Sequence, residues 1–123
     1  MDYLVVGLGG FLGANARYLV ANWIGERYGT SFPYGTLLIN VSGSFLIGLF
    51  LMLVTERFLV HPNWRLFFSV GFLGAYTTFS TFSFESLALI HNGFWRLGLL
   101  NMLGSVVLGL GATLCGVALA RLF

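Results

Sequence analysis

Long apolar runs follow one another along almost the whole of this chain, and charged residues are confined to a few positions, most of them between the runs. Of the 123 residues, 58% are hydrophobic and only 8% are charged, whereas a soluble domain carries about 25% charged residues. A transmembrane helix needs about 20 apolar residues. The chain therefore fits four spans, predicted at residues 3–23, 35–55, 66–90 and 97–122. We expect a single all-α integral membrane domain over residues 1–123, with no ATP-hydrolysing module.

The few charged and reactive side chains exclude several classes of function. The net charge of +2 comes from six arginines and four acids, which is too small a surplus for a nucleic-acid-binding surface. The single Cys115 cannot form an internal disulfide. No histidines or cysteines occur at the spacing of a zinc site, and no nucleophile–base pair is evident. We therefore expect no enzymatic activity and no nucleic-acid partner.

The predicted third span changes character halfway along its length. It starts as an apolar helix containing Gly71 and Gly74, and then hydroxyl residues alternate with phenylalanines as far as Glu85. Glycine weakens a helix through backbone entropy and threonine is stiff at χ1, so we predict a break near residues 74–78. Carbonyl oxygens freed at such a break can coordinate a cation. Because the membrane core offers no water, this polar run must face a cavity or other protein.

Beyond the break, the sequence predicts a surface suited to a small anion. On a continuous helix, Thr77, Thr81 and Glu85 would stack on one face, with Phe79 and Phe82 on the adjoining face. The edges of aromatic rings carry partial positive charge, so rings and hydroxyl groups can solvate an anion weakly enough to release it. The alternative is that the two phenylalanines only pack against lipid or protein. Glu85 could bind a proton or a cation, or accept hydrogen bonds from hydroxyl groups.

Two further polar residues lie inside predicted spans. Arg17 stands about two-thirds of the way through the first span, where burial of an arginine costs about 2.5–3.5 kcal/mol. Its side chain either reaches the nearer interface or forms a positive mouth that attracts anions. Asn40 lies near the middle of the second span and shares a face with Ser44 and Gly48. Its amide either joins two helices or faces a permeating anion.

Small residues recur at helical spacing in the first and fourth spans. Gly9 and Gly13 have the GxxxG spacing that allows two helices to approach closely. The fourth span carries a stripe of small and polar residues on one face, made up of Asn101, Ser105, Gly109, Ala112 and Gly116. We expect both to be packing surfaces, against another helix or a second subunit. Asn101 and Ser105 could also add to a polar pathway.

The arginines give little instruction about the orientation of the chain. With four spans, the side of both termini holds Arg57, Arg65 and Arg121, and the other side holds Arg27 and Arg96. The balance is three against two, or three against three if Arg17 reaches the second side. Because an excess of arginine sets orientation, a chain so balanced is predicted to insert both ways and to pair antiparallel with itself.

Three motifs occur in order along the chain: Gly10-x-x-Gly13-Ala14-x-x-Arg17-Tyr18, then Gly35-Thr36-Leu37-x-x-Asn40-x-x-Gly43-x-x-x-x-Gly48, then Gly71-Phe72-Leu73-Gly74-x-x-Thr77-Thr78-Phe79-Ser80-Thr81-Phe82-Ser83. Together they resemble the CrcB/Fluc family of bacterial fluoride channels. The resemblance covers essentially the whole chain, and the third motif is highly specific. It implies a fluoride-selective channel of the bacterial cytoplasmic (inner) membrane, formed by an antiparallel dual-topology homodimer with two pores in membrane lipid.

The resemblance also implies roles for particular residues. The broken third span would hold a structural Na⁺ at the dimer interface through the backbone carbonyls of Gly74 and Thr77 from each subunit. Phe79 and Phe82 would line the fluoride pores together with the amide of Asn40. The cationic mouth would be Arg17. A hydroxyl track ending in a carboxylate would consist of Ser80, Thr81, Ser83 and Glu85.

Two departures from the family pattern bear on these roles. Ala75 stands where many relatives have a second glycine, which is tolerable if only Gly74 needs unusual geometry. In the fourth span, Asn101, Ser105 and Gly109 stand near positions where the family often has a tyrosine and two serines. The contribution of this span to the pore is therefore left open.

Two other functions fit the general architecture of the chain. A small four-span proton-coupled multidrug exporter would need an acid in the first span, and the only acid there is Asp2 at its edge. A purely structural membrane-assembly protein would explain the stripes of small residues, but not the run of threonine, phenylalanine and serine in the third span. Passive export of fluoride explains both features and needs no energy-coupling domain.

Overall fold

The computed structural model describes the whole chain, residues 1–123, as helices joined by short connections. Three helical segments are long and apolar enough to cross a membrane, namely Asp2–Tyr28, Tyr34–Arg57 and Trp95–Ala120. The first is α1 and the third is α6. The second consists of α2 (Tyr34–Met52) and a π-helical turn, η1 (Leu53–Arg57). The expected class, an all-helical membrane protein, is confirmed.

The first helix is longer than its apolar sequence suggests. It continues to Tyr28, whereas the sequence predicts an end at residue 23. Arg27 remains helical and its guanidinium carbon lies 4.6 Å from the centre of the Trp23 ring. The helix ends at Gly29, whose φ of 78° lies in the left-handed region that glycine adopts without strain. Hydropathy marks where the apolar residues stop, which is not where this helix stops.

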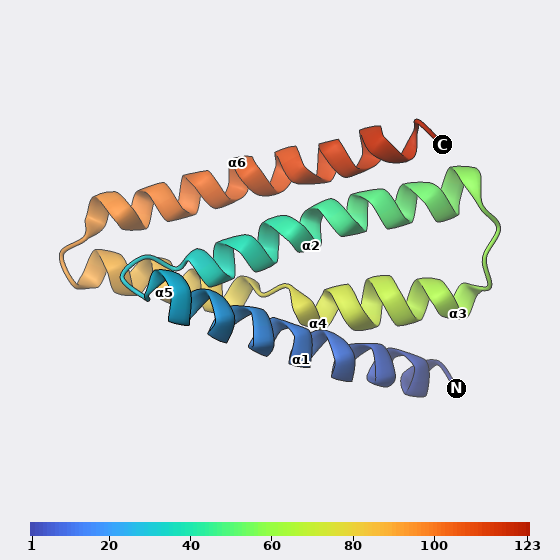
Figure 1. Cartoon of the computed structure of the whole chain (residues 1–123), viewed down its shortest axis with the longest axis horizontal. Helices are drawn as coiled ribbons and strands as arrows, with labels where there is room; N and C mark the ends of the chain where they lie inside the picture. The colour runs from blue at the N-terminus through green and yellow to red at the C-terminus, as the bar shows by residue number, and fades with distance from the viewer.

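The predicted third span consists of several segments. α3 (Pro62–Arg65) runs without interruption into the π-helical η2 (Leu66–Leu73) and then into α4 (Gly74–Tyr76). Thr77 and Thr78 are extended, and α5 (Phe79–His91) follows them. In Figure 1 the continuous helical segment formed by α3, η2 and α4 is followed by α5 along the long axis of the bundle. Because Thr77 and Thr78 interrupt the helix, Thr77 does not share a helical face with Thr81 and Glu85, and that expectation was wrong.

The ends of the bundle follow the alternation expected of four spans. Both termini lie at one end, together with the connection between η1 and α3, and the other two connections lie at the opposite end (Figure 1). Arg57 joins two of these segments, because its guanidinium donates to the carbonyl oxygen of Arg121 at 2.8 Å. Arg65 likewise donates to the hydroxyl of Thr55 at 3.0 Å.

Glycines set the closest approaches between helices. An added Cβ at Gly9 or Gly13 of α1 would overlap the carbonyl oxygen of Phe67 or Phe72 in η2. An added Cβ at Gly116 of α6 would overlap the carbonyl oxygen of Phe45 in α2. The close packing predicted for the GxxxG pair and for the end of the fourth-span stripe is therefore confirmed.

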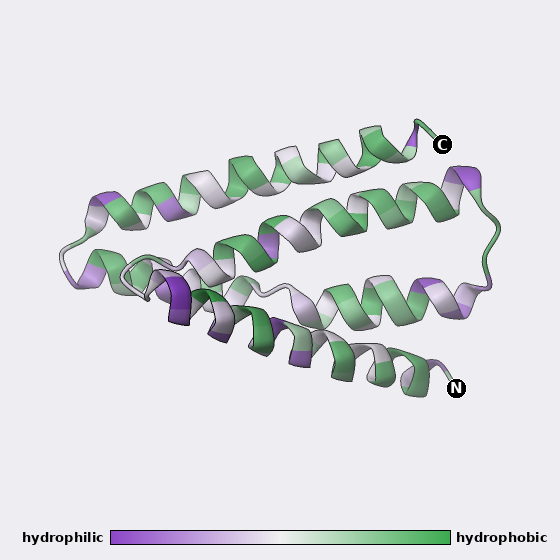
Figure 2. Ribbon diagram, in the orientation of Figure 1, coloured by the Kyte–Doolittle hydropathy of each residue, from purple (hydrophilic) through white to green (hydrophobic).

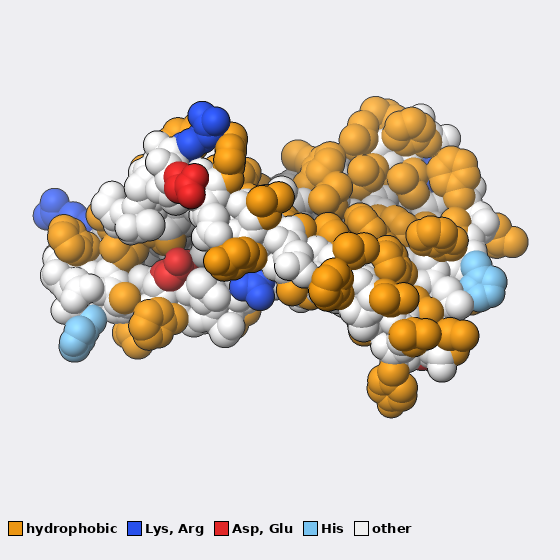
Figure 3. All heavy atoms as spheres, turned by 60° about the horizontal axis from the view of Figure 1, so that its bottom comes forward, with side chains coloured by type: hydrophobic (Ala, Val, Ile, Leu, Met, Phe, Trp, Pro, Cys, Tyr) orange, Lys and Arg blue, Asp and Glu red, His pale blue; other side chains and the backbone are white.

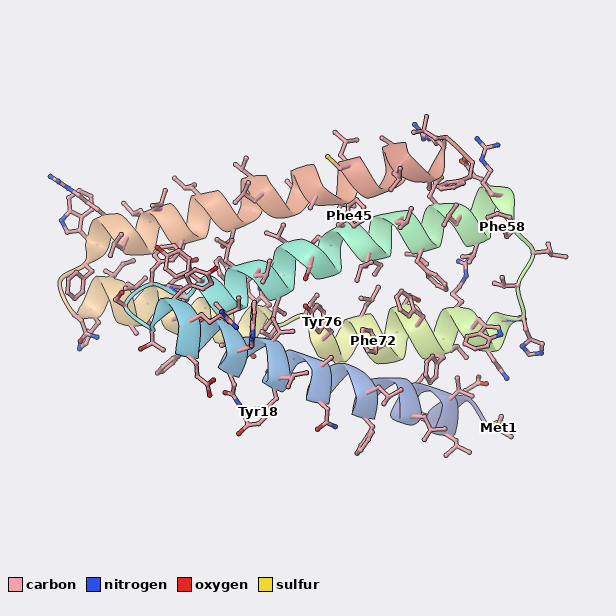
Figure 4. All side chains as sticks on the ribbon, in the orientation of Figure 1. Met1, Tyr18, Phe45, Phe58, Phe72 and Tyr76 are labelled. Atoms are coloured by element: carbon pink, nitrogen blue, oxygen red, sulfur yellow. The ribbon has the colours of Figure 1, made fainter.

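The interior of the bundle is small and centres on Ile39, Leu73 and Tyr76. Phe68, Phe72 and Tyr76 form a stack along one side of the third span, with ring centres 5.6 and 5.9 Å apart. Tyr76 reaches from α4 toward α2, where its hydroxyl lies 3.0 Å from that of Ser42 (Figure 4). This stack supports the helix immediately before the extended residues.

The outer surface is mainly apolar, as a lipid-facing surface requires. Hydrophobic residues run along all the long helices, and hydrophilic residues gather at the ends and near the middle of the bundle (Figure 2). On the face shown in Figure 3, hydrophobic side chains cover most of one half, while most of the visible charged side chains lie in the other. Polar groups near the middle of the bundle belong to the candidate site.

Candidate functional site

Thr77 and Thr78 are extended, and we call these two residues the break. At the break, backbone amide groups donate to side chains and not to the carbonyl groups that they would reach in a continuous helix. In such a helix the Thr78 amide would donate to the Gly74 carbonyl four residues earlier; instead it donates to Asn40 Oδ1 at 2.8 Å. The Thr81 amide would donate to the Thr77 carbonyl, and instead donates to Thr78 Oγ1 at 3.2 Å. The carbonyls of Gly74 and Thr77 thus lose their helical donors.

Asn40 satisfies both backbone groups of Thr78. Its Oδ1 accepts from the Thr78 amide, and its Nδ2 donates to the Thr78 carbonyl oxygen at 3.0 Å. Unpaired backbone groups are costly where no water reaches them, so this pair stabilises the break. Nδ2 carries two hydrogens, and this pair uses one of them. Asn40 therefore joins two helices and still offers one N–H group to its surroundings.

Thr78 starts the helix that follows the break. Its hydroxyl is the N-cap of α5, since it accepts from the Thr81 amide and donates to the Thr81 hydroxyl at 3.1 Å. Thr77 bonds in the other direction, because its hydroxyl donates to the Leu73 carbonyl at 2.9 Å. The two adjacent threonines therefore end one helix and begin the next.

Arg17 binds the end of the helix that precedes the break. Its Nε donates to the carbonyl oxygen of Ala75 at 3.1 Å, a group that would pair with the Phe79 amide in a continuous helix. The side chain is half-buried and is directed into the bundle rather than toward the interface. A cation is favourable at the carboxyl end of a helix because the carbonyl groups there carry partial negative charge.

A cavity of about 360 Å³ opens beside the break, and we call it the break cavity. It collects polar groups from α2, the third span and α6, but no charged side chain. Its lining includes Asn40, Ser44, Ser69, Leu73, Gly74, Thr77, Thr78, Phe79, Phe82 and Ser105. Asn40 and Ser44 were predicted to share a face of their helix, and both line this cavity.

The two predicted aromatic residues stand together at this cavity. The ring centres of Phe79 and Phe82 are 5.7 Å apart and the rings are tilted by 54°. Phe79 is 78% exposed in the single chain, so one side of the cavity has no cover from its own helices. Amide, hydroxyl and ring-edge groups without formal charge can hold a small anion weakly, which is the condition for rapid release.

Other predicted site residues lie away from the break cavity. Ser80 and Ser83 are exposed on α5, and the Thr81 hydroxyl is engaged with Thr78. Glu85 faces a second hollow of about 350 Å³, which it shares with Thr30 and Ser31 of the connection between α1 and α2. The Glu85 Oε1 atom is buried and accepts no hydrogen bond. The structure thus brings together Asn40, Gly74, Thr77, Phe79 and Phe82, but not the proposed hydroxyl track.

A polar contact between α5 and α6 was not anticipated from the sequence. Asn101 Nδ2 donates to Ser86 Oγ at 2.8 Å, and Ser105 Oγ donates to Asn101 Oδ1 at 3.3 Å. Ser86 is buried and was not among the predicted residues. The available signal was the pair of polar residues in two apolar helices that are joined by a short turn at Gly93.

Comparison with known proteins identifies one family. The sequence model described as "CrcB-like protein, Camphor Resistance (CrcB)" matches residues 4–117. The chain is 52% identical over 121 residues to a protein from Solibacter usitatus named fluoride-specific ion channel FluC, covering 98% of this chain and 99% of that protein.

Two further relatives carry the same name. The protein from Koribacter versatilis is 50% identical over 120 residues, covering 98% of this chain and 95% of that protein. The protein from Chloroflexus aurantiacus is 45% identical over 122 residues, covering 99% of this chain and 97% of that protein. The similarity therefore extends over both helices that flank the break and over all the residues around the cavity.

Proposed function

The chain belongs to the CrcB-like family, and from this premise we propose that it is a fluoride-selective channel that passively exports fluoride across the bacterial cytoplasmic membrane. The observation that carries the proposal is the identity of about one half, over nearly the full length, to bacterial proteins named fluoride-specific ion channels. The apolar helices make it a multi-pass membrane protein. Export would lower the fluoride concentration, and hence fluoride toxicity, inside the cell.

Passive movement is sufficient for this task. Fluoride enters acidified cells as neutral HF and dissociates inside, so the ion accumulates and then leaves down its own gradient through any selective pore. Selectivity over chloride would come from a narrow pathway lined by stiff donors that a larger anion cannot enter. No step of this scheme needs ATP or a coupled ion.

The pathway we propose passes the break cavity. Asn40 offers a free N–H group there, Phe79 and Phe82 offer ring edges, and the hydroxyl groups of Thr78 and Ser105 stand nearby. None of these groups carries a full charge, so the anion would be bound weakly enough to leave. Arg17 adds a positive charge at the break from outside the cavity, which lowers the cost of bringing an anion to membrane depth.

A Na⁺ ion fits the backbone of the break. Carbonyl oxygens are suitable ligands for hard cations, and the carbonyls of Gly74 and Thr77 have lost their helical donors to Asn40 and to the Thr78 hydroxyl. We propose that these two carbonyls, with the same pair from a second copy, hold a structural Na⁺. When bound, the ion would offset the charge of a nearby anion and join the two copies.

The assembly we propose is an antiparallel, dual-topology homodimer in which the third span is broken at Thr77 and Thr78. Polar groups in a membrane must be covered by protein, yet Ser80 and Ser83 are exposed on α5 beside the highly exposed Phe79. A second copy would cover this surface and close the open side of the break cavity. Ser80, Thr81, Ser83 and Glu85 would then form the continuation of the pathway toward the membrane surface.

Efflux from liposomes tests the function. Purified protein is reconstituted into liposomes loaded with potassium fluoride, valinomycin is added to carry potassium, and released fluoride is measured with an ion-selective electrode. We expect rapid release of fluoride without a proton gradient, and retention of chloride in parallel liposomes. Release that requires a proton gradient would indicate a coupled exporter, and no release from folded protein would indicate a structural role.

A further inference from the structure

A second, apolar groove begins where α1 stops and α2 starts, at the end of the bundle opposite the termini (Figure 1). Its volume of about 610 Å³ is within the range of pockets that hold small molecules, about 300–1,000 Å³. Residues of α1, α2 and α6 line it, all of them aliphatic or aromatic, and none comes from α5 or the break. Apolar cavities stay free of water, so we expect an apolar chain to fill this groove.

The groove runs from the membrane interface into the hydrocarbon. Tyr28 and Tyr34 stand at its outer end, with ring centres 6.3 Å apart, and tyrosine is enriched at membrane–water interfaces. Along α2 the lining continues from Tyr34 to Val41, which is about 10 Å at the rise of a helix. This is the course that an acyl chain follows below its headgroup.

Arg27 places a positive charge beside the groove. Its guanidinium carbon lies 4.6 Å from the centre of the Trp23 ring, which lines the groove. Arg27 stands about 6 Å beyond Trp23 along the helix axis, within a headgroup layer about 5–7 Å thick. Arg57 and Arg65 donate to protein oxygen atoms, whereas Arg27 forms no ion pair and donates to no protein group. Its N–H groups are therefore available to a phosphate.

No acid at this end offsets the charge of Arg27 on the groove. Trp23 and Arg27 are four residues apart and share a face of α1. Glu26 is turned away from that face, because consecutive residues of a helix are about 100° apart. Glu85 faces the hollow beside the connection between α1 and α2, and does not line the groove. An uncharged channel with a free cation at its outer end suits an amphiphile with an anionic head.

We propose that this groove binds one anionic phospholipid, with an acyl chain between Trp23 and Leu108 and the phosphate at Arg27. A second copy is not needed to fill it, because the assembly proposed above covers α5, which contributes nothing to the groove. The net charge of +2 also favours an anionic lipid over another copy of the chain. In an antiparallel pair the two grooves would open to opposite leaflets. The inference requires a membrane location, but not fluoride conduction.

Quenching of tryptophan fluorescence by lipids with brominated acyl chains tests the site. The chain has three tryptophans, so a protein with Trp64→Phe and Trp95→Phe keeps Trp23 as its only fluorescent reporter in the groove. It is reconstituted in phosphatidylcholine bilayers in which a small fraction of brominated phosphatidylglycerol or phosphatidylcholine is included. We expect the anionic lipid to bind beside Trp23 about fivefold more strongly, as one arginine near a membrane surface provides.

Two arginine variants of this reporter protein separate a specific site from general attraction. Arg27→Gln should reduce the preference for phosphatidylglycerol to about one, because it removes the charge at the groove. Arg96→Gln is the matched control and should keep the preference. In the wild-type chain Arg96 also lies over a tryptophan ring, 5.3 Å from the centre of Trp95, but it does not line the groove. Circular dichroism checks that both variants are as helical as the parent protein.

Three outcomes would overturn the inference. Equal quenching by the two brominated lipids would show that the groove does not select an anionic head. A preference that survives Arg27→Gln, or that falls as far in Arg96→Gln, would show attraction to the surface as a whole. Protection of Trp23 from both lipids would mean that protein covers the groove. Fluoride efflux is measured separately, so each of these results leaves the proposed function open to its own test.

Discussion

At the scale of single residues, Asn40 answers a question that the sequence left open. Its amide was expected either to join helices or to face an anion, and the geometry allows both, because one N–H group binds the Thr78 carbonyl and the other stays free. An amide is suited to this position because it is a donor and an acceptor without charge. A carboxylate in its place could accept from Thr78 but could not donate.

Replacement of Asn40 by alanine should destabilise the protein. The amide and the carbonyl of Thr78 would lose their partners, and each buried unpaired group costs about 1–3 kcal/mol. We expect the free energy of unfolding in detergent to fall by at least about 2 kcal/mol. Asn22→Ala, on the exposed side of α1, is the control. Equal stability of the two variants would show that the Asn40–Thr78 pair contributes nothing.

Arg17 can be tested for two separate roles, since its donor and its charge can be removed one at a time. Glutamine places an N–H group at the position of the arginine Nε, whereas lysine keeps the charge and has carbon there. If the bond to Ala75 is what matters for folding, Arg17→Gln should unfold at nearly the wild-type temperature and Arg17→Lys at a lower one. The opposite order would favour a purely electrostatic role.

At the scale of helices, close packing between α1 and η2 holds the broken span in place. Gly13→Ala would push a methyl group against the Phe72 carbonyl, and overpacking of this kind costs about 1–3 kcal/mol. Gly7→Ala in the same helix meets no atom within 4 Å and should be neutral or slightly stabilising. Thermal unfolding of both variants in detergent checks this difference. A Gly13→Ala protein as stable as Gly7→Ala would mean that the two helices separate easily.

The sequence was informative about the helices to the extent that hydropathy and glycine spacing report on them. Three of the four predicted spans correspond to helices long and apolar enough to cross a membrane, and the closeness of Gly9 and Gly13 to a neighbouring helix was also predictable. The extension of α1 to Tyr28 was not, because charged residues at a membrane surface can stay helical. The π-helical form of η2 also has no simple sequence signal, since it depends on the backbone hydrogen bonds along the whole helical segment formed by α3, η2 and α4.

The candidate site was only partly predictable for a related reason. Motif resemblance placed Asn40, Phe79 and Phe82 in one site, and all three line the break cavity. The partners of Asn40 and Arg17 are backbone groups of the broken span, and a sequence pattern says nothing about which backbone groups become free. Ser86 was missed because the available signal, a polar residue on each of two helices joined by a short turn, does not show that the two side chains meet.

At the scale of the whole molecule, the structure alters the charge balance that bears on orientation. Arg17 binds Ala75 inside the bundle, so the two ends hold three and two arginines, Arg57, Arg65 and Arg121 against Arg27 and Arg96. A difference of one arginine is a weak signal for orientation. We therefore predict that the chain inserts in both directions.

Tag accessibility in whole cells tests this prediction. A C-terminal tag should be reached from both sides of the membrane in comparable amounts. Adding two arginines at the terminal end through Leu122→Arg and Phe123→Arg should place most copies with the termini inside and reduce fluoride resistance, since antiparallel pairs would become rare. A tag on the wild-type protein that is reached from one side of the membrane only would contradict the proposed antiparallel assembly.

The central claim is that fluoride passes the break cavity, and fluoride efflux from liposomes carrying matched phenylalanine variants tests it most directly. Phe79 lines the cavity, whereas Phe84 is similarly exposed on the same helix and does not. The account predicts rapid, chloride-excluding efflux from the wild type and from Phe84→Ile, and efflux slowed by about tenfold or more in Phe79→Ile, the equivalent of one lost contact with the ion. Equal rates in all three proteins would contradict it.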